Sequence, residues 1–234
     1  MHMICKRILL IVFCLASSIA FAQETAVRKM GSFNKLELGG HFDLRLKKGD
    51  KAEITIETED IGPDEIITEI KNNTLRITMK DDRQLRKGDL KRSIIYLTYT
   101  ELQGIQWDGA GNITTESELV ADKFDLEISG AGNVKMDLRV DNLQVDMSGA
   151  GNIEMRGSAR TQDVQMSGAG NYNGFELKSE KAKVDMSGVG NVRVYATKEL
   201  NASASGVGAV RYKGNPENVI KNSSSFLGSI KPGD

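Results

Sequence analysis

The side chains best suited to catalysis are carboxylates that recur just before a repeated glycine-rich motif. They occupy alternating polar positions at Asp125, Glu127, Asp146, Asp163 and Asp185. Two carboxylates on adjacent coils of a stacked structure would lie about 5 Å apart, near the separation used by retaining glycosidases. A solvated strand face explains the same positions, because similar slots hold Gln106, Gln144 and Gln165. We favour the solvated face and keep a carbohydrate-active enzyme as an alternative.

The sequence lacks the histidine and cysteine residues that other common catalytic and metal-binding sites need. Both cysteines, Cys5 and Cys14, lie in the first 22 residues, and beyond them His41 is the single histidine, next to a predicted glycine turn. These counts exclude a cysteine–histidine metal cluster and a histidine-based triad. The G-x-G triplets precede predicted strands rather than helices, which argues against a dinucleotide-binding loop. We expect no catalytic residue, no metal and no cofactor.

Six copies of a short motif dominate the second half of the chain. They are Trp107-Asp-Gly-Ala-Gly-Asn112, Ile128-Ser-Gly-Ala-Gly-Asn133, Met147-Ser-Gly-Ala-Gly-Asn152, Met166-Ser-Gly-Ala-Gly-Asn171, Met186-Ser-Gly-Val-Gly-Asn191 and Ala204-Ser-Gly-Val-Gly-Ala209. The copies recur every 18 to 21 residues. A fixed period of this length indicates one structural unit that is copied and stacked.

A unit of this size cannot fold alone. It would bury a few aliphatic side chains, worth roughly 1.5–3 kcal/mol each, whereas ordering its backbone costs roughly 1–2 kcal/mol per residue. Stacking lets each coil hydrogen-bond to the coils before and after it. Propeller blades are excluded because they need about 40–45 residues. We predict an all-β chain whose main part is a β-solenoid, like a parallel β-helix, with coils of about 19 residues.

The motif residues have expected roles in such a stack. Stacked amides bond from coil to coil in cross-β structures, so we expect ladders of Asn112, Asn133, Asn152, Asn171 and Asn191. A parallel serine ladder would contain Ser129, Ser148, Ser167, Ser187 and Ser205. The glycines permit the corner through positive φ or close backbone approach; they are Gly109, Gly111, Gly130, Gly132, Gly149, Gly151, Gly168, Gly170, Gly188 and Gly190. The small residue between each pair is expected to point inward at Ala110, Ala131, Ala150, Ala169, Val189 and Val207.

The rest of the chain divides into three parts. Residues 1–22 have a basic start, a short apolar run and the Ala20-Phe21-Ala22 cleavage pattern, which predict a secretory signal peptide. Residues 23–215 form the predicted β-solenoid domain, whose N-terminal part has short alternating strands and is less regular. One helical turn is expected between Pro63 and Ile70. Residues 216–234 leave the repeat and are expected to form a cap and tail.

Charge composition limits the partners. The chain has 31 basic and 32 acidic residues, for a net charge of −1, and the signs are mixed along it. Nucleic-acid binding requires a basic stripe that this sequence lacks. With a leader peptide and no cysteine beyond it, the chain is expected in the periplasm, at the cell surface or outside the cell, held together without disulfides.

The motifs also carry a resemblance to a known family. The Gly-Ala-Gly-Asn-Ile/Val motifs at 109–113, 130–134 and 149–153, with the entry pattern Phe33-x-x-Leu-x-Leu, resemble the Bacteroidetes family called "putative auto-transporter adhesin, head GIN domain". The resemblance covers roughly residues 30 to 215. It implies a β-helix-like fold and a surface or envelope location.

Two functional hypotheses stand beside the enzyme. The first is a non-enzymatic exported scaffold, involved in adhesion or envelope interaction, that binds an unknown protein or glycan of the envelope or surface across a flat ladder face. The second is a purely structural envelope protein that associates with itself as a homo-oligomer through sheet faces or coil ends.

Overall fold

The computed structural model describes residues 24–59, 62–80, 93–223 and 228–233. The predicted signal peptide therefore lies outside the described residues. The described chain is nearly all strand, with one 3₁₀ turn, η1 (Pro63–Glu65), and no helix long and apolar enough to cross a membrane. The all-β prediction is confirmed.

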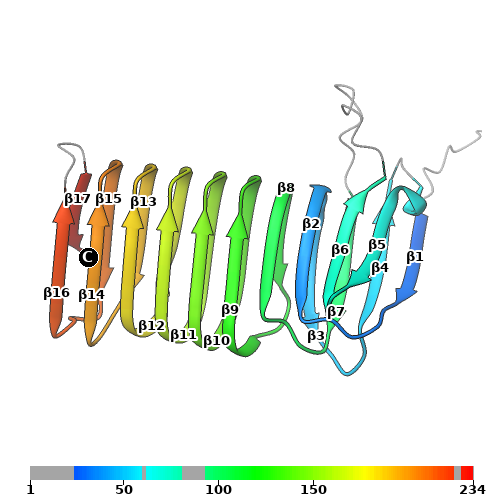
Figure 1. Ribbon diagram of the computed structural model, residues 1–234, viewed down its shortest axis with the longest axis horizontal. Coiled ribbons are helices and arrows are strands. Elements are labelled where there is room, and N and C mark those ends of the chain that lie inside the picture. The colour runs from blue at the N-terminus through cyan, green and yellow to red at the C-terminus, as the bar shows by residue number, and fades with distance from the viewer. Residues whose placement is uncertain (1–23, 60–61, 81–92, 224–227, 234) are drawn as a thin grey trace, which may run out of the picture.

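A β-solenoid of about six turns occupies residues 104–232 (Figure 1). Each strand pairs in parallel with the strand one coil later, so the motif copies lie directly above one another. The solenoid strands are β8 (Gly104–Thr115), β9 (Leu119–Ile128), β10 (Ala131–Met147), β11 (Ala150–Met166), β12 (Ala169–Met186), β13 (Val189–Tyr195), β14 (Glu199–Ala204), β15 (Val207–Lys213), β16 (Asn218–Ser223) and β17 (Gly228–Pro232). The predicted solenoid with coils of about 19 residues is confirmed.

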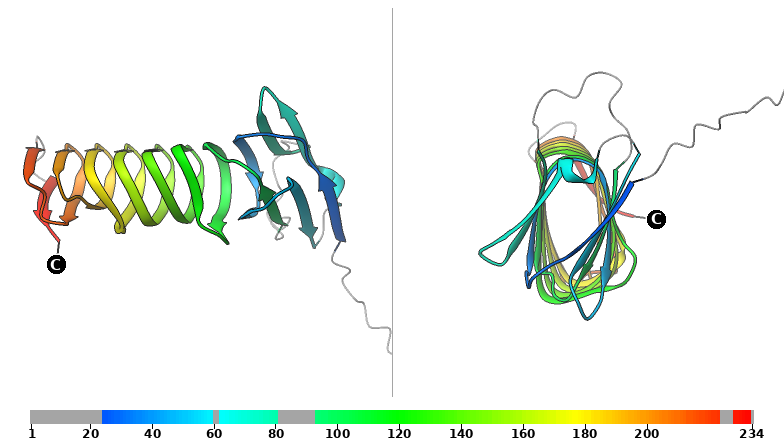
Figure 2. Two further views of the ribbon diagram at one scale, coloured as in Figure 1. Left: turned by 90° about the horizontal axis from the view of Figure 1, so that it is seen from below. Right: turned by 90° about the vertical axis from the view of Figure 1, so that its right-hand side faces the viewer.

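Each coil is a flattened oval with two long sides (Figure 2). We call the side that follows the motif, residues 131–140 in one coil, the first side, and the side that precedes the next motif, residues 142–147, the second side. Period-2 alternation sends one set of side chains from both sides into a continuous interior. One interior column on the first side holds Ile113, Val134, Ile153, Tyr172, Val192 and Val210, all at most 2% exposed.

The N-terminal part continues the stack before it becomes irregular. Strands β2 (Lys35–His41) and β3 (Asp43–Lys48) pair in parallel with β8, and then with β6 (Thr74–Met79) and β7 (Ser93–Tyr99) respectively. The antiparallel strands β1 (Glu24–Lys29), β4 (Glu53–Thr58) and β5 (Ile66–Lys71) close this end. The helical turn expected over Pro63–Ile70 is only the 3₁₀ turn η1, because Ile66 onward pairs with β6.

The C-terminal strands form one more coil, in which polar residues take positions that are apolar in the earlier coils. On the second side, the column Val145, Val164, Val184 and Ala202 ends at Lys221, and the column of Met147, Met166, Met186 and Ala204 ends at Ser223. Lys221 Nζ lies 4.9 Å from the ring centroid of Tyr212, on the facing side. An inward-directed charge on an edge strand opposes strand addition by another molecule.

We expect Lys221→Leu to promote end-to-end association. The substitution extends the apolar interior to the open end of the stack and removes the charge that a second molecule would bury. Light scattering coupled to size exclusion should show a dimer fraction that rises with protein concentration. The matched control is Lys181→Leu, on an outward position of β12; equal association of both variants would contradict the role of Lys221.

Candidate functional site: the motif face

The two glycines of each motif let successive coils approach more closely than any side chain allows. A Cβ added to Gly149 would lie 1.9 Å from the carbonyl oxygen of Gly130, one coil earlier. A Cβ on Gly151 would lie 1.7 Å from Gly132 O, and Gly151 also has φ of +144°. The first glycine is thus required by close approach alone, and the second by close approach and by its backbone conformation.

The small residue between the glycines points outward, contrary to the sequence-based expectation. Ala131, Ala150 and Ala169 are exposed, and Val189 and Val207 are 57% and 46% exposed. The reason is that alternation continues through the corner: from buried Met147 to buried Ile153, every second position faces inward, and these inward positions are the glycines. Counting by two through the motif would have revealed this from the sequence.

The asparagine side chains bond from coil to coil along the outside of the corner. Each Nδ2 donates to the Oδ1 one coil earlier: Asn133 to Asn112 at 3.1 Å, Asn152 to Asn133 at 3.0 Å, Asn171 to Asn152 at 2.9 Å and Asn191 to Asn171 at 3.0 Å. At the N-terminal end, Asp43 Oδ1 accepts from Nδ2 of Asn112 at 2.7 Å. Asp43 is thus the first acceptor of a chain of amides that all point the same way, and sequence reasoning missed it.

The serines also stack, but the hydroxyls of two of them bond to the main chain instead of to one another. Ser129 Oγ donates to the carbonyl oxygen of Trp107 at 3.5 Å, and Ser148 Oγ to that of Ile128 at 3.4 Å. These acceptors lie one coil earlier, within reach of a short side chain. All five serines of the column are exposed.

The serine column lies in the floor of a long shallow groove of about 1590 Å³. Its floor consists of the serine, glycine and alanine or valine positions of five successive coils, from Asp108 to Val189. Its N-terminal end is lined by His41, Arg76 and Met79 from β2 and β6. His41, expected as a solvated turn residue, is the exposed last residue of β2 and lines this end of the groove.

The carboxylates that were considered for catalysis lie on the outer face of the second side. Three of them have close polar partners: Asp125 pairs with Lys123 and Asp163 with Lys183, each at 2.9 Å, and Asp146 accepts from Gln144 at 2.9 Å. In-register pairing brings Glu127 and Asp146 onto adjacent coils, but Asp125 and Asp163 are separated by Gln144. The hydrogen bond from Lys183 to Asp163 raises the pKa of Lys183, as expected for a lysine whose charged form is stabilised by a neighbouring carboxylate.

The corner between the two sides carries a further ion pair. Glu180 accepts from Lys198 Nζ at 2.8 Å, and this bond lowers the pKa of Glu180. A general acid needs the opposite shift. Within the described ranges, no group of three or more histidine, cysteine or acidic side chains is arranged to hold a metal ion.

Comparison with known proteins places the chain among adhesin-like solenoids. A family profile described as "Putative auto-transporter adhesin, head GIN domain" matches residues 32–216. A crystal structure of a "putative adhesin" from Bacteroides fragilis is 27% identical, with a TM-score of 0.86, and the match covers 91% of this chain and 98% of that one.

More distant structures share the fold. A "putative adhesin" from Parabacteroides distasonis is 18% identical with a TM-score of 0.64, over 90% of this chain and 97% of that one. A "putative lipid binding protein" from the same species is 20% identical with a TM-score of 0.58, over 88% and 96%. A search of curated proteins finds no match.

Gly149→Ala should destabilise the protein by more than about 2 kcal/mol, because its Cβ would overlap the Gly130 carbonyl and force the coils apart. Ala150→Val is the matched control, since the same column already holds valine at Val189 and Val207. Urea unfolding of both variants measures the difference. Similar midpoints for the two variants would contradict the close-approach argument.

Asn152→Asp should lower stability at neutral pH by about 1 kcal/mol, because the carboxylate cannot donate to Asn133. Asn201→Asp is the control: it makes the same charge change on an outward position that pairs with Lys183. Thermal unfolding is the measurement. An unchanged melting temperature for Asn152→Asp at neutral pH would refute a stabilising ladder.

Proposed function

Because the chain belongs to the "Putative auto-transporter adhesin, head GIN domain" family, we propose that it is an exported, non-enzymatic binding protein. Its ligand is a protein or glycan of the cell envelope or surface, and it binds across the motif face. The predicted signal peptide supports export, and the adhesin names of the family and its structural neighbours support a binding role.

The observation that carries this proposal is the groove along the motif face. It presents the same exposed serine and alanine or valine groups at each of several coils, at the strand spacing of about 4.8 Å. Such a surface repeats its contacts along one direction, which suits an extended ligand better than a compact substrate. Because the floor is rigid main chain held by coil-to-coil hydrogen bonds, little ordering is needed on binding.

The ion-paired carboxylates favour binding over catalysis. Asp125 and Asp163 are each held against a lysine on the outer face of the second side, away from the groove. A glycosidase instead needs two carboxyl groups on either side of a scissile bond, one of them with a raised pKa.

We would test the proposal with residues 23–234 on a glycan array that reports binding and cleavage together, alongside a pull-down from envelope extract. Ala150→Tyr should reduce ligand binding at least about tenfold, because the new side chain projects into the groove from an exposed position. Val120→Tyr is the control, since Val120 is 42% exposed on β9 and is not among the residues that line the groove.

Loss of binding in Ala150→Tyr alone would support the motif face. Cleavage of any glycan would overturn the non-enzymatic assignment and direct attention to Asp146 and Asp185. Failure to bind any glycan or envelope protein would overturn the binding role. Equal binding by both tyrosine variants would move the ligand to another face.

A further inference from the structure

Several basic side chains on the middle coils form ion pairs with carboxylates. In-register stacking places residues of successive coils side by side, and these columns pair opposite charges: Lys135 with Glu154 at 3.8 Å, and Lys181 with Glu199 at 2.9 Å. Pairs between neighbouring coils also hold Arg139, Arg156, Lys183 and Lys198, whereas Lys123 pairs with Asp125 on its own strand. Because a column of like charges repels itself, this pairing is the arrangement expected of a stable solenoid.

One column near the C-terminal end stacks cations without such pairing. Arg193 on β13 pairs in register with Arg211 on β15, and Arg211 with Lys231 on β17. No carboxylate of the described residues forms an ion pair with any of the three, and Arg211 and Lys231 are exposed. Three cations therefore stand in a row at about 4.8 Å per step along the solenoid axis.

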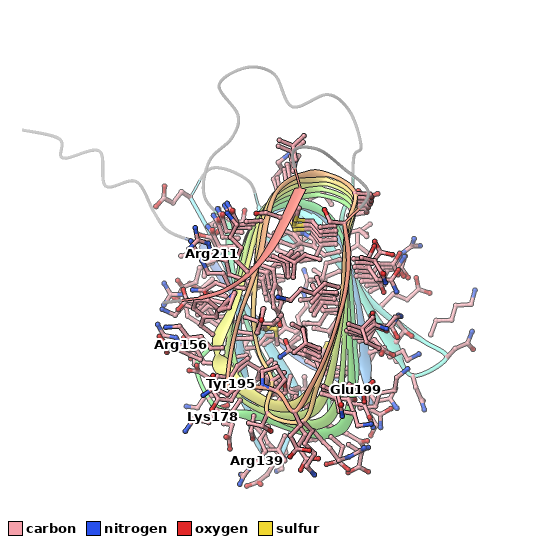
Figure 3. All side chains as sticks on the ribbon, turned by 90° about the vertical axis from the view of Figure 1, so that its left-hand side faces the viewer. Arg139, Arg156, Lys178, Tyr195, Glu199 and Arg211 are labelled. Atoms are coloured by element: carbon pink, nitrogen blue, oxygen red, sulfur yellow. The ribbon has the colours of Figure 1, made fainter. Side chains whose placement is uncertain are left out.

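A fourth cation, Lys213, lies beside these three. Lys213 follows Arg211 by two residues and faces the same way, and its Nζ lies 4.7 Å from the ring centroid of Phe175. This contact orients the ammonium group without neutralising it. We name Arg193, Arg211, Lys213 and Lys231 the cationic row. Figure 3 shows Arg211 on the same side of the oval as Arg156, and Glu199 on the opposite side.

We propose that the cationic row binds a linear acidic polysaccharide whose carboxylates lie along the solenoid axis. The row lies outside the residues that line the motif-face groove, so the proposal rests on the binding role above and adds a second binding surface to it. Self-repulsion within the row costs stability that a bound polyanion would recover. The two guanidinium groups can each bind a carboxylate through two parallel hydrogen bonds.

The surroundings of the row favour a sugar polymer over other polyanions. The neighbouring column holds Asn191, Ala209 and Ser229, which supply a flat surface with an amide and a hydroxyl for sugar hydroxyl groups. Tyr195 lies two residues after Arg193 on β13 and pairs in register with Lys213. An extended acidic peptide would present same-face side chains about 6.6–6.8 Å apart, a poorer match to the coil spacing.

Nucleic acid fits less well for a different reason. Its affinity comes from many phosphate contacts along a basic surface, whereas the cationic row has four members and the chain as a whole carries a net charge of −1. A short array of cations suits a polymer with one carboxylate per sugar ring.

The experiment measures the affinity of residues 23–234 for oligogalacturonate at several salt concentrations, with neutral dextran as the comparison. The triple variant Arg193→Gln, Arg211→Gln, Lys231→Gln should bind at least about tenfold more weakly, and its affinity should depend less on salt. The control triple Lys135→Gln, Arg139→Gln, Lys181→Gln removes the same charge from coils whose cations are paired. It should bind within about twofold of the parent.

Thermal unfolding of the row variant distinguishes a loss of ligand contacts from a loss of folding stability. The row variant should melt at the same temperature as the parent or higher, because it relieves repulsion between like charges. A lower melting temperature together with weaker binding would assign the row a structural role and overturn the proposal.

Three further outcomes would also overturn it. They are the absence of oligogalacturonate binding, binding that the row variant leaves unchanged, and tighter row-dependent binding of poly-glutamate or single-stranded DNA. If the glycan array still detects another ligand in the first two cases, the proposed function stands while the cationic row is rejected.

Discussion

Main-chain hydrogen bonding between successive coils is the constraint on which the rest of this structure depends. At the motif, the amide of Ala150 donates to the Gly130 carbonyl and that of Ala169 to the Gly149 carbonyl, each at 3.0 Å. These bonds form only because the inward positions of the corner have no side chain. The glycine pairs therefore keep the coils at strand spacing where the chain turns most sharply, and this spacing aligns every residue with its counterpart one coil away.

In-register alignment decides which side chains can repeat. Apolar residues and asparagine gain from stacking on themselves, since identical neighbours pack or exchange a hydrogen bond. Like charges repel when they stack, and several outward columns of the middle coils instead place opposite charges side by side, as at Lys181 and Glu199. The cationic row departs from this pattern, and that departure is the reason to look there for an anionic ligand.

The two ends of the stack are built differently. At the N-terminal end, the antiparallel strands β1, β4 and β5 depart from the parallel stack, and Asp43 provides the first acceptor of the amide chain. At the C-terminal end, β16 and β17 keep the parallel pairing but bring Lys221 and Ser223 into the interior columns. An apolar interior that stopped abruptly would invite another molecule to continue it.

The repeat length and the alternation of residues such as Leu143, Val145 and Met147 determined the all-β solenoid, because period and polarity are properties of the sequence itself. The family resemblance followed from the same motifs. Local patterns were a poorer guide wherever pairing with a distant strand decided the outcome. The segment from Ile66 to Lys71 is a strand because it pairs with β6, and the outward direction of Ala150 follows from alternation that continues across the corner.

The candidate sites show the same division. Glycine and asparagine recur visibly in the sequence, but the contact of Asn112 with Asp43 joins residues 69 positions apart. Asp163 could be read as a catalytic carboxylate until the structure placed Lys183 beside it. Arg193, Arg211 and Lys231 are unremarkable in the linear chain and form a row only after folding. The sequence by itself determines what repeats within one coil, whereas the register between coils decides which charges become neighbours.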